Sequence, residues 1–161
     1  MNETRSSTVE CSNCGRKFVP GSCLTPEEVT VDHGNEPFVT DIEADTERNN
    51  YFRRALWTGK YLQVTLMSIK VGEDVGLERH DDTDQFLRVE KGRGLVQMGH
   101  NSNELNVEHR VESDSAIMVP AGMWHNITNI GKTPLKLYSI YAPPEHPFGT
   151  IHRTKEDDIH S

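Results

Sequence analysis

Short segments in which apolar and polar residues alternate dominate the chain from Tyr51 onward. In the clearest of them, Leu62, Val64 and Leu66 fall on one face of an extended backbone. Turns rich in Gly, Pro, Asn and Asp separate the segments, which predict strands at 61–70, 85–90, 94–98, 115–119, 124–129 and 135–141. Because no long amphipathic helix lies between them, this pattern favours an all-β sandwich or barrel over an α/β parallel sheet.

The two ends of the chain have a different texture. Residues 1–50 are rich in Ser, Thr, Glu, Asp, Asn and Pro and have no sustained apolar period, so we predict a loosely structured N-terminal arm. Residues 51–161 are predicted to form the barrel. Pro143, Pro144 and Pro147 cannot continue a central strand, which predicts a surface wrap after Tyr141, and residues 154–161 are predicted to be a charged tail.

Composition narrows the possible partners. The chain has 161 residues, 25 of them acidic and 17 basic, for a net charge of −8. Since nucleic acids and anionic membranes attract clustered Lys and Arg, we expect neither as a partner. No apolar stretch approaches the roughly 20 residues of a transmembrane helix, and no secretory signal begins the sequence. A soluble, cytoplasmic single-domain protein is therefore expected.

Two polar clusters interrupt the strand pattern. The first runs from Gly72 to Gly92 and contains Glu78, His80 and Gln85; Glu78 and His80 are two residues apart and so share one face of an extended chain. The second has a Pro-x-Gly turn directly before a predicted strand, and it consists of Pro120, Gly122, His125 and Asn129.

These clusters resemble the two motifs of the cupin superfamily, over about residues 61–141. The first family motif is Gly, five residues, His-x-His, three or four residues, Glu, six residues and Gly; the second is Gly, five residues, Pro-x-Gly, two residues, His, three residues and Asn. Here Glu78 replaces the first His, Gln85 replaces the Glu, and Asp114 replaces the leading Gly of the second motif. The resemblance implies an all-β, double-stranded β-helix (the cupin or jelly-roll barrel) with an N-terminal extension, and a homodimer.

The resemblance also implies that Glu78, His80, Gln85 and His125 bind one divalent transition metal. Two imidazoles, a carboxylate and an amide oxygen suit Zn, Fe, Mn, Ni or Co. A register that uses His80 and Asp82 as the first pair leaves the interval to Gln85 too short for the family pattern. The alternative is a polar pocket without metal, in which His80 hydrogen-bonds to Gln85 or Glu78.

The three cysteines, Cys11, Cys14 and Cys23, all lie near the N-terminus. Their odd number argues against a disulfide framework. The Cys-x-x-Cys pair with Cys23, and with His33 as a conceivable fourth ligand, matches part of a structural zinc site, whereas free thiols are the alternative.

Three functions fit a cupin with these ligands. Phosphomannose isomerases, also cupins, use a mixed Gln, His, Glu, His zinc site, which suggests a small metalloenzyme that isomerises a sugar or sugar phosphate. An Fe- or Mn-dependent dioxygenase fits a triad of two histidines and one carboxylate. A non-catalytic module that binds a small ligand is the third.

A few other residues bear on the expected small-molecule substrate or ligand. Arg53, Arg54 and Arg88 are the best candidates for binding an anionic group, although solvated surface charge is the commoner role of arginine. His146 and His152 in the C-terminal wrap are either ordinary surface histidines or, if the wrap crosses the barrel mouth, one of them lies near the substrate.

Overall fold

The computed structural model describes residues 9–10, 17–18 and 31–159, and the chain divides into two compact units, Met1–Thr30 and Val31–Ser161. In the first unit, β1 (Val9–Glu10) pairs antiparallel with β2 (Lys17–Phe18). Cys11, Cys14 and Cys23 lie outside the described residues, so the structural zinc site stays a prediction. Composition placed residues 31–50 in the N-terminal arm, but in the structure they belong to the second unit.

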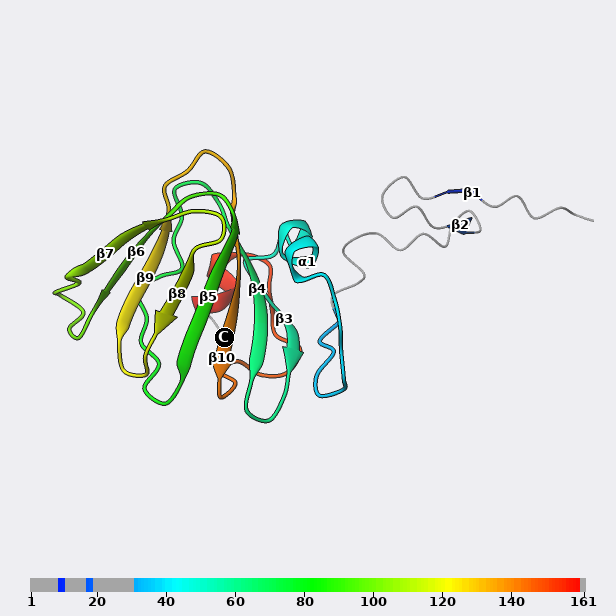
Figure 1. Ribbon diagram of the computed structural model, residues 1–161, viewed down its shortest axis with the longest axis horizontal. Helices are drawn as coiled ribbons and strands as arrows, with labels where there is room; N and C mark the ends of the chain where they lie inside the picture. The colour runs from blue at the N-terminus through cyan, green and yellow to red at the C-terminus, as the bar shows by residue number, and fades with distance from the viewer. Residues whose placement is uncertain (1–8, 11–16, 19–30, 160–161) are drawn as a thin grey trace, which may run out of the picture. The chain divides into compact units, whose positions relative to one another are not determined.

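The second unit consists mainly of two antiparallel sheets (Figure 1). Six strands form the larger sheet in the order β11-β3-β4-β10-β5-β8: β3 (Arg53–Thr58), β4 (Gln63–Ile69), β5 (Asp84–Lys91), β8 (Ala116–Val119), β10 (Leu135–Ala142) and β11 (Ile151–His152). Three strands form the smaller sheet in the order β7-β6-β9: β6 (Gly94–Gly99), β7 (Val107–Val111) and β9 (Trp124–Asn129). The all-β fold expected from the alternating pattern is confirmed.

The six predicted strands match β4, β5, β6, β8, β9 and β10 to within two residues at their ends. The pattern missed β3, β7 and the two-residue β11. In β7, four of the five residues are exposed, so no apolar alternation marks it. The pattern also missed two short helices, α1 (Ile42–Arg48) and α2 (Lys155–Ile159). The second of these lies in the predicted charged tail, which is therefore helical over part of its length.

One apolar core fills the space between the sheets. Aliphatic side chains from both sheets make up most of it, and its largest fully buried members are Met67, Ile69, Leu87, Ile127, Leu135 and Leu137. At about 25 cal/mol per Å² of apolar surface removed from water, this core is the main favourable term in folding.

A second, smaller apolar cluster covers the opposite face of the larger sheet. Leu56, Leu66 and Tyr138 form it, and Ile42 of α1 packs against them. Asp41 caps α1, because its side-chain oxygen accepts a hydrogen bond from the backbone N–H of Ala44 at 3.0 Å. The helix is therefore fixed outside the sheet, and its first turn contributes one apolar residue to the cluster.

The strand register gives the inner face of the larger sheet an apolar end and a polar end. Leu137 lies opposite Met67 of β4 and Val89 of β5, which makes one apolar row. Two residues further along β10, and therefore on the same face, Ser139 lies opposite Thr65 and Leu87. Two residues beyond that, Tyr141 lies opposite Gln63 and Gln85. The polar end of this face is where the candidate site lies.

Asp114, which stands where the cupin motif has a glycine, adopts the backbone conformation that favours glycine. Its φ is +72°, in the left-handed region that aspartate tolerates better than most residues. Its backbone N–H donates to the carbonyl of Val89 at 2.9 Å, and its carboxylate accepts a hydrogen bond from Arg88 at 2.8 Å. The turn therefore keeps its geometry despite the substitution.

Candidate metal centre

Backbone pairing brings the two polar clusters together. The N–H of Glu78 donates to the carbonyl of His125 at 3.0 Å, and the N–H of His125 donates back to Glu78 at 2.9 Å. The Pro-x-Gly turn contributes as well, since the N–H of Gly122 donates to the carbonyl of His80 at 2.8 Å. The loop that carries Glu78 and His80 is thereby held along β9, so that the two motifs face one another.

Three of the four predicted ligands converge. Glu78 Oε1 lies 3.4 Å from His80 Nε2 and 3.3 Å from His125 Nε2. One donor atom from each residue lies within 4.8 Å of the others, which is close enough for all three to hold one metal ion. All three atoms are buried, and apart from these contacts with one another they have no hydrogen-bond partner within the described part of the chain.

The partners of the two imidazoles show which nitrogen of each ring faces Glu78. His125 Nδ1 lies 3.0 Å from the backbone carbonyl of Met123, and His80 Nδ1 lies 3.0 Å from a carboxylate oxygen of Glu145. A carbonyl or carboxylate oxygen can only accept, so Nδ1 is the donor in both rings. In the neutral rings, the Nε2 lone pairs then point toward Glu78, the arrangement in which imidazole binds a metal.

The charge of Glu78 fits the same role. Burial by itself raises the pKa of this carboxyl, but the His125 and His80 rings and the Arg53 guanidinium outweigh it and hold the pKa well below its usual range. Burial lowers the pKa of His80, yet Glu78 and Glu145 more than offset it, and the net shift is upward. Glu78 is therefore ionised at neutral pH and attracts a cation, either a proton on His80 or a metal ion.

Gln85, the fourth predicted ligand, lies opposite Tyr141 at the polar end of the larger sheet, and one atom of its amide already makes a hydrogen bond. Its Nε2 donates to the Ser139 hydroxyl at 2.8 Å, and its Oε1 is buried with no hydrogen-bond partner among the described residues. The amide oxygen is the atom that would bind a metal, and the contact with Ser139 leaves it free to do so. Coordination by Gln85 stays a prediction.

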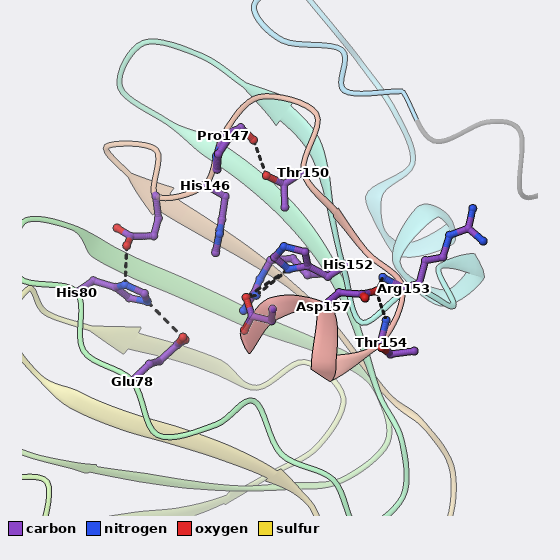
Figure 2. Close-up of polar contacts among 12 residues, drawn as sticks. Glu78, His80, His146, Pro147, Thr150, His152, Arg153, Thr154 and Asp157 are labelled. Carbon is purple, nitrogen blue, oxygen red and sulfur yellow. Dashed lines mark hydrogen bonds and ion pairs between the residues drawn. The ribbon is translucent and has the colours of Figure 1, made fainter. Parts of the chain in front are cut away.

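Further polar side chains surround the triad. The Tyr141 ring packs edge-on against His80, with ring centroids 5.7 Å apart, and against His146, 5.2 Å away. His146 in turn lies 6.1 Å from the His152 ring, and Figure 2 shows His146 pointing from the wrap toward the space between His80 and His152. The C-terminal wrap therefore places His146 beside Tyr141, which in turn contacts His80 of the triad.

Gln63 fixes this part of the wrap. Its amide nitrogen donates to the His146 carbonyl at 2.9 Å, and its amide oxygen accepts from the backbone N–H groups of Glu145 and His146, at 3.2 and 2.9 Å. Sequence reasoning missed Gln63 as an anchor and Glu145 as the partner of His80. The wrap has no periodicity that could reveal which of its residues face the pocket.

The three arginines differ in location. Arg88 is partly exposed and pairs with Asp114, and Arg54 lies on the outer face of β3. Arg53 instead has no exposed surface at all, so surface solvation is the wrong interpretation for it. Burial opposes its charge, but Tyr141, Asp158 and Glu78 outweigh that effect and raise its pKa above the usual value.

No helix within residues 31–159 has the length and apolar character needed to cross a membrane.

Known proteins share this fold and the region that carries these motifs. Residues 65–141 match the family model of the cupin domain. The protein YrkC of Bacillus subtilis is 62% identical over 128 residues, which make up 80% of this chain and 69% of YrkC. The protein L612 of Acanthamoeba polyphaga mimivirus is 38% identical over 122 residues, 75% of this chain and 74% of L612.

A solved structure agrees with the fold in three dimensions. The crystal structure of BH2720 from Bacillus halodurans is 62% identical in sequence and aligns with a TM-score of 0.81. The alignment covers 81% of this chain and 99% of BH2720. Together with the two facing antiparallel sheets, it confirms the double-stranded β-helix, or jelly-roll, architecture.

Proposed function

This chain belongs to the cupin superfamily, and we propose that it binds one divalent first-row transition metal and acts as a small metalloenzyme on a small polar molecule. The observation that carries the proposal is the convergence of three buried donor atoms that have no other partner: Glu78 Oε1, His80 Nε2 and His125 Nε2. Three electron-pair donors this close repel one another unless a cation lies among them. Two imidazoles and one carboxylate suit Fe, Mn, Co, Ni or Zn.

The residues around the triad have separate tasks in this proposal. Glu145 and the carbonyl of Met123 orient the two imidazoles through their Nδ1 atoms. A bound divalent metal would supply Lewis acidity toward a substrate oxygen. Gln85 offers a further oxygen, either to the metal or to a substrate hydroxyl.

Two groups near the triad, His146 and Tyr141, are suited to the proton transfer of an isomerase-like reaction. Burial and the charge of Arg53 lower the pKa of His146 to about 4, so its ring is neutral at pH 7. Its Nε2 is buried and unpaired among the described residues. The Tyr141 hydroxyl is also buried, and burial raises its pKa, so it is protonated at neutral pH. These two atoms can accept and donate a proton beside a substrate, the type of step that an isomerase requires.

An Fe- or Mn-dependent dioxygenase is the second candidate, because a triad of two histidines and one carboxylate leaves coordination positions open for O2 and substrate. The two reactions differ in their need for oxygen. Turnover that consumes O2 and stops under anaerobic conditions supports the dioxygenase. Turnover with Zn(II) in the absence of O2 supports the isomerase-like enzyme.

Elemental analysis of the purified full chain tests the metal site. We expect about one metal ion per chain in the wild type, and its loss in Glu78→Ala/His125→Ala. The matched control is Glu108→Ala/His109→Ala, which removes the same residue types from the exposed strand β7 and should keep the metal. A Cys11→Ser/Cys14→Ser variant separates any metal held by the N-terminal cysteines.

A wild type that takes up no Fe(II), Mn(II) or Zn(II) would contradict the proposal. The non-catalytic ligand-binding module would then be the better interpretation of the pocket. Equal metal content in Glu78→Ala/His125→Ala and in the wild type would place the metal elsewhere on the chain.

A further inference from the structure

Arg53 is a fully buried arginine with one edge of its guanidinium group unused. Its Nη1 donates to Asp158 at 2.5 Å and lies 3.4 Å from His152 Nδ1. Its Nε and Nη2 are buried and make no well-formed hydrogen bond within the described residues, and the Tyr141 hydroxyl lies beside the guanidinium group. Leaving charged donors buried and unpaired costs more than leaving neutral ones, so this edge needs an acceptor that the described residues do not supply.

The unused edge has the geometry of a carboxylate receptor. In a planar guanidinium group, the N–H of Nε and one N–H of Nη2 point in the same direction, so together they can donate to both oxygens of one carboxylate. Asp158 already occupies the other side of the group, which holds the guanidinium in place. A fixed, two-donor edge favours a planar oxyanion over an uncharged hydroxyl or carbonyl group.

The edge lies near the triad. Arg53 of β3 lies opposite Met67 of β4, whose side chain is on the inner face of the larger sheet. Arg53 is therefore on the same face as Tyr141 of β10. The Tyr141 hydroxyl lies within hydrogen-bonding reach of the Arg53 side chain, and the Glu78 carboxylate is near enough to help raise the pKa of Arg53. Tyr141 also contacts His80 through its ring, and its buried hydroxyl lies beside Ser139 and Arg53. Tyr141 therefore links the arginine edge to the triad.

The charge balance points in the same direction. A divalent metal at the triad and Arg53 would contribute three positive charges, against the two negative charges of Glu78 and Asp158. Glu145 adds a third carboxylate, but a third of its side chain is exposed, so solvent screens part of its charge. Since Arg53 is the only fully buried arginine or lysine side chain among the described residues, the pocket suits a carboxylate better than a doubly charged phosphate.

We propose that the substrate is a small carboxylic acid whose carboxylate binds Nε and Nη2 of Arg53 and the hydroxyl of Tyr141, while another of its oxygens faces the triad. This inference rests on the proposed function, because it names the substrate class of the same site. It assigns substrate specificity to Arg53 on β3 and Tyr141 on β10, the two strands that flank β4 in the larger sheet.

Calorimetric titration of the full chain tests the inference with defined probes. Acetate and lactate are compared with their uncharged amides, acetamide and lactamide, and with inorganic phosphate, using both metal-free and Zn(II)-loaded protein. The key variant is Arg53→Lys, which keeps a positive charge for Asp158 but lacks the two-donor edge. Arg54→Lys, on the opposite face of the same strand, is the matched control.

The wild type and Arg54→Lys should bind the acids and not the amides. Arg53→Lys should bind them at least ten-fold more weakly, and so should Tyr141→Phe, which removes a single oxygen and keeps the ring packing. Circular dichroism and thermal unfolding show whether each variant is folded. If Arg53→Lys does not fold, the Tyr141→Phe result and the comparison of acids with amides decide.

Failure of this inference is distinguishable from failure of the metal proposal. Acid binding that is unchanged in a folded Arg53→Lys, equal binding of acids and amides, or no acid binding at all would overturn the carboxylate site. Preference for phosphate over both acids would overturn it as well. Arg53-dependent acid binding by a protein that takes up no metal would support this inference and contradict the proposed metalloenzyme.

Discussion

Replacing Gln63 by methionine should loosen the C-terminal wrap and destabilise the protein far more than an ordinary glutamine substitution on a strand. Gln63 has no exposed surface and makes four hydrogen bonds: to Thr58, to the His146 carbonyl, and from the N–H groups of Glu145 and His146. Methionine has a similar length and shape but can make none of them. Three of the four partners are backbone groups of the wrap, and they lose their acceptor or donor.

The expected magnitude follows from these contacts. At about 1 kcal/mol per hydrogen bond, the loss is about 4 kcal/mol, reduced to about 3 kcal/mol by the better burial of methionine. The wrap cannot simply detach and become hydrated, because the N–H of Gly149 donates to Asp32 at 2.9 Å and the N–H of Ala55 donates to the carbonyl of Thr150 at 2.8 Å. The freed backbone groups therefore stay near the protein surface with few alternatives.

Equilibrium unfolding in urea measures this loss. With an m-value of about 2 kcal/mol/M, a loss of about 3 kcal/mol lowers the midpoint by about 1.5 M. Gln97→Met is the control, since Gln97 is half-buried and makes one long hydrogen bond of 3.3 Å, to Glu108; its effect should be within about 0.5 kcal/mol. A loss below about 1 kcal/mol for Gln63→Met, or a loss equal to that of the control, would refute the reasoning.

Two further predictions concern stability. Asn129 donates to the carbonyls of Ile69 and Thr133 and accepts from the N–H of Gly131, each at 2.9 Å, so Asn129→Ala should cost about 2–3 kcal/mol in urea unfolding, and a change below 1 kcal/mol would contradict this. Burial and Arg53 lower the pKa of His146 from an ordinary value of 6.5 to about 4, so between these values the unfolded chain binds a proton that the folded protein does not. The free energy of unfolding should therefore fall as the pH drops from 6.5 toward 4. Between pH 7.5 and pH 5, His146→Gln should lose less unfolding free energy than the wild type does. Equal losses would argue against a lowered pKa of His146.

Local sequence patterns were enough to predict most of the fold. Strands such as β4 and β10 bury one face each, and the alternation this produces is visible in the sequence. The short helix α1 was not visible, because seven residues with a single apolar contact to the sheet produce no period. Its capping Asp41 is a local signal that could have indicated where the helix begins.

The candidate site was predictable only where its residues follow a motif. The spacing of Glu78, His80 and His125 indicated the triad, and the structure brings their donor atoms together. Arg53 and Gln63 belong to no motif, since their role depends on which strands become neighbours and on where the wrap returns. Tertiary contacts between residues about 80–105 positions apart, such as Gln63 with His146 or Arg53 with Asp158, have no local signature.

The central position of β10 also has a consequence for how the chain folds. β4 and β5 follow one another along the sequence, yet they do not pair; each pairs with β10, whose first residue comes more than 40 residues after the end of β5. Until that strand docks, both neighbours expose unpaired backbone edges that can join other chains. Pairing between strands so far apart in the sequence slows folding, to roughly the milliseconds-to-seconds range of β-rich domains. Refolding yield should therefore depend strongly on protein concentration, and β10 is the segment whose late arrival sets that sensitivity.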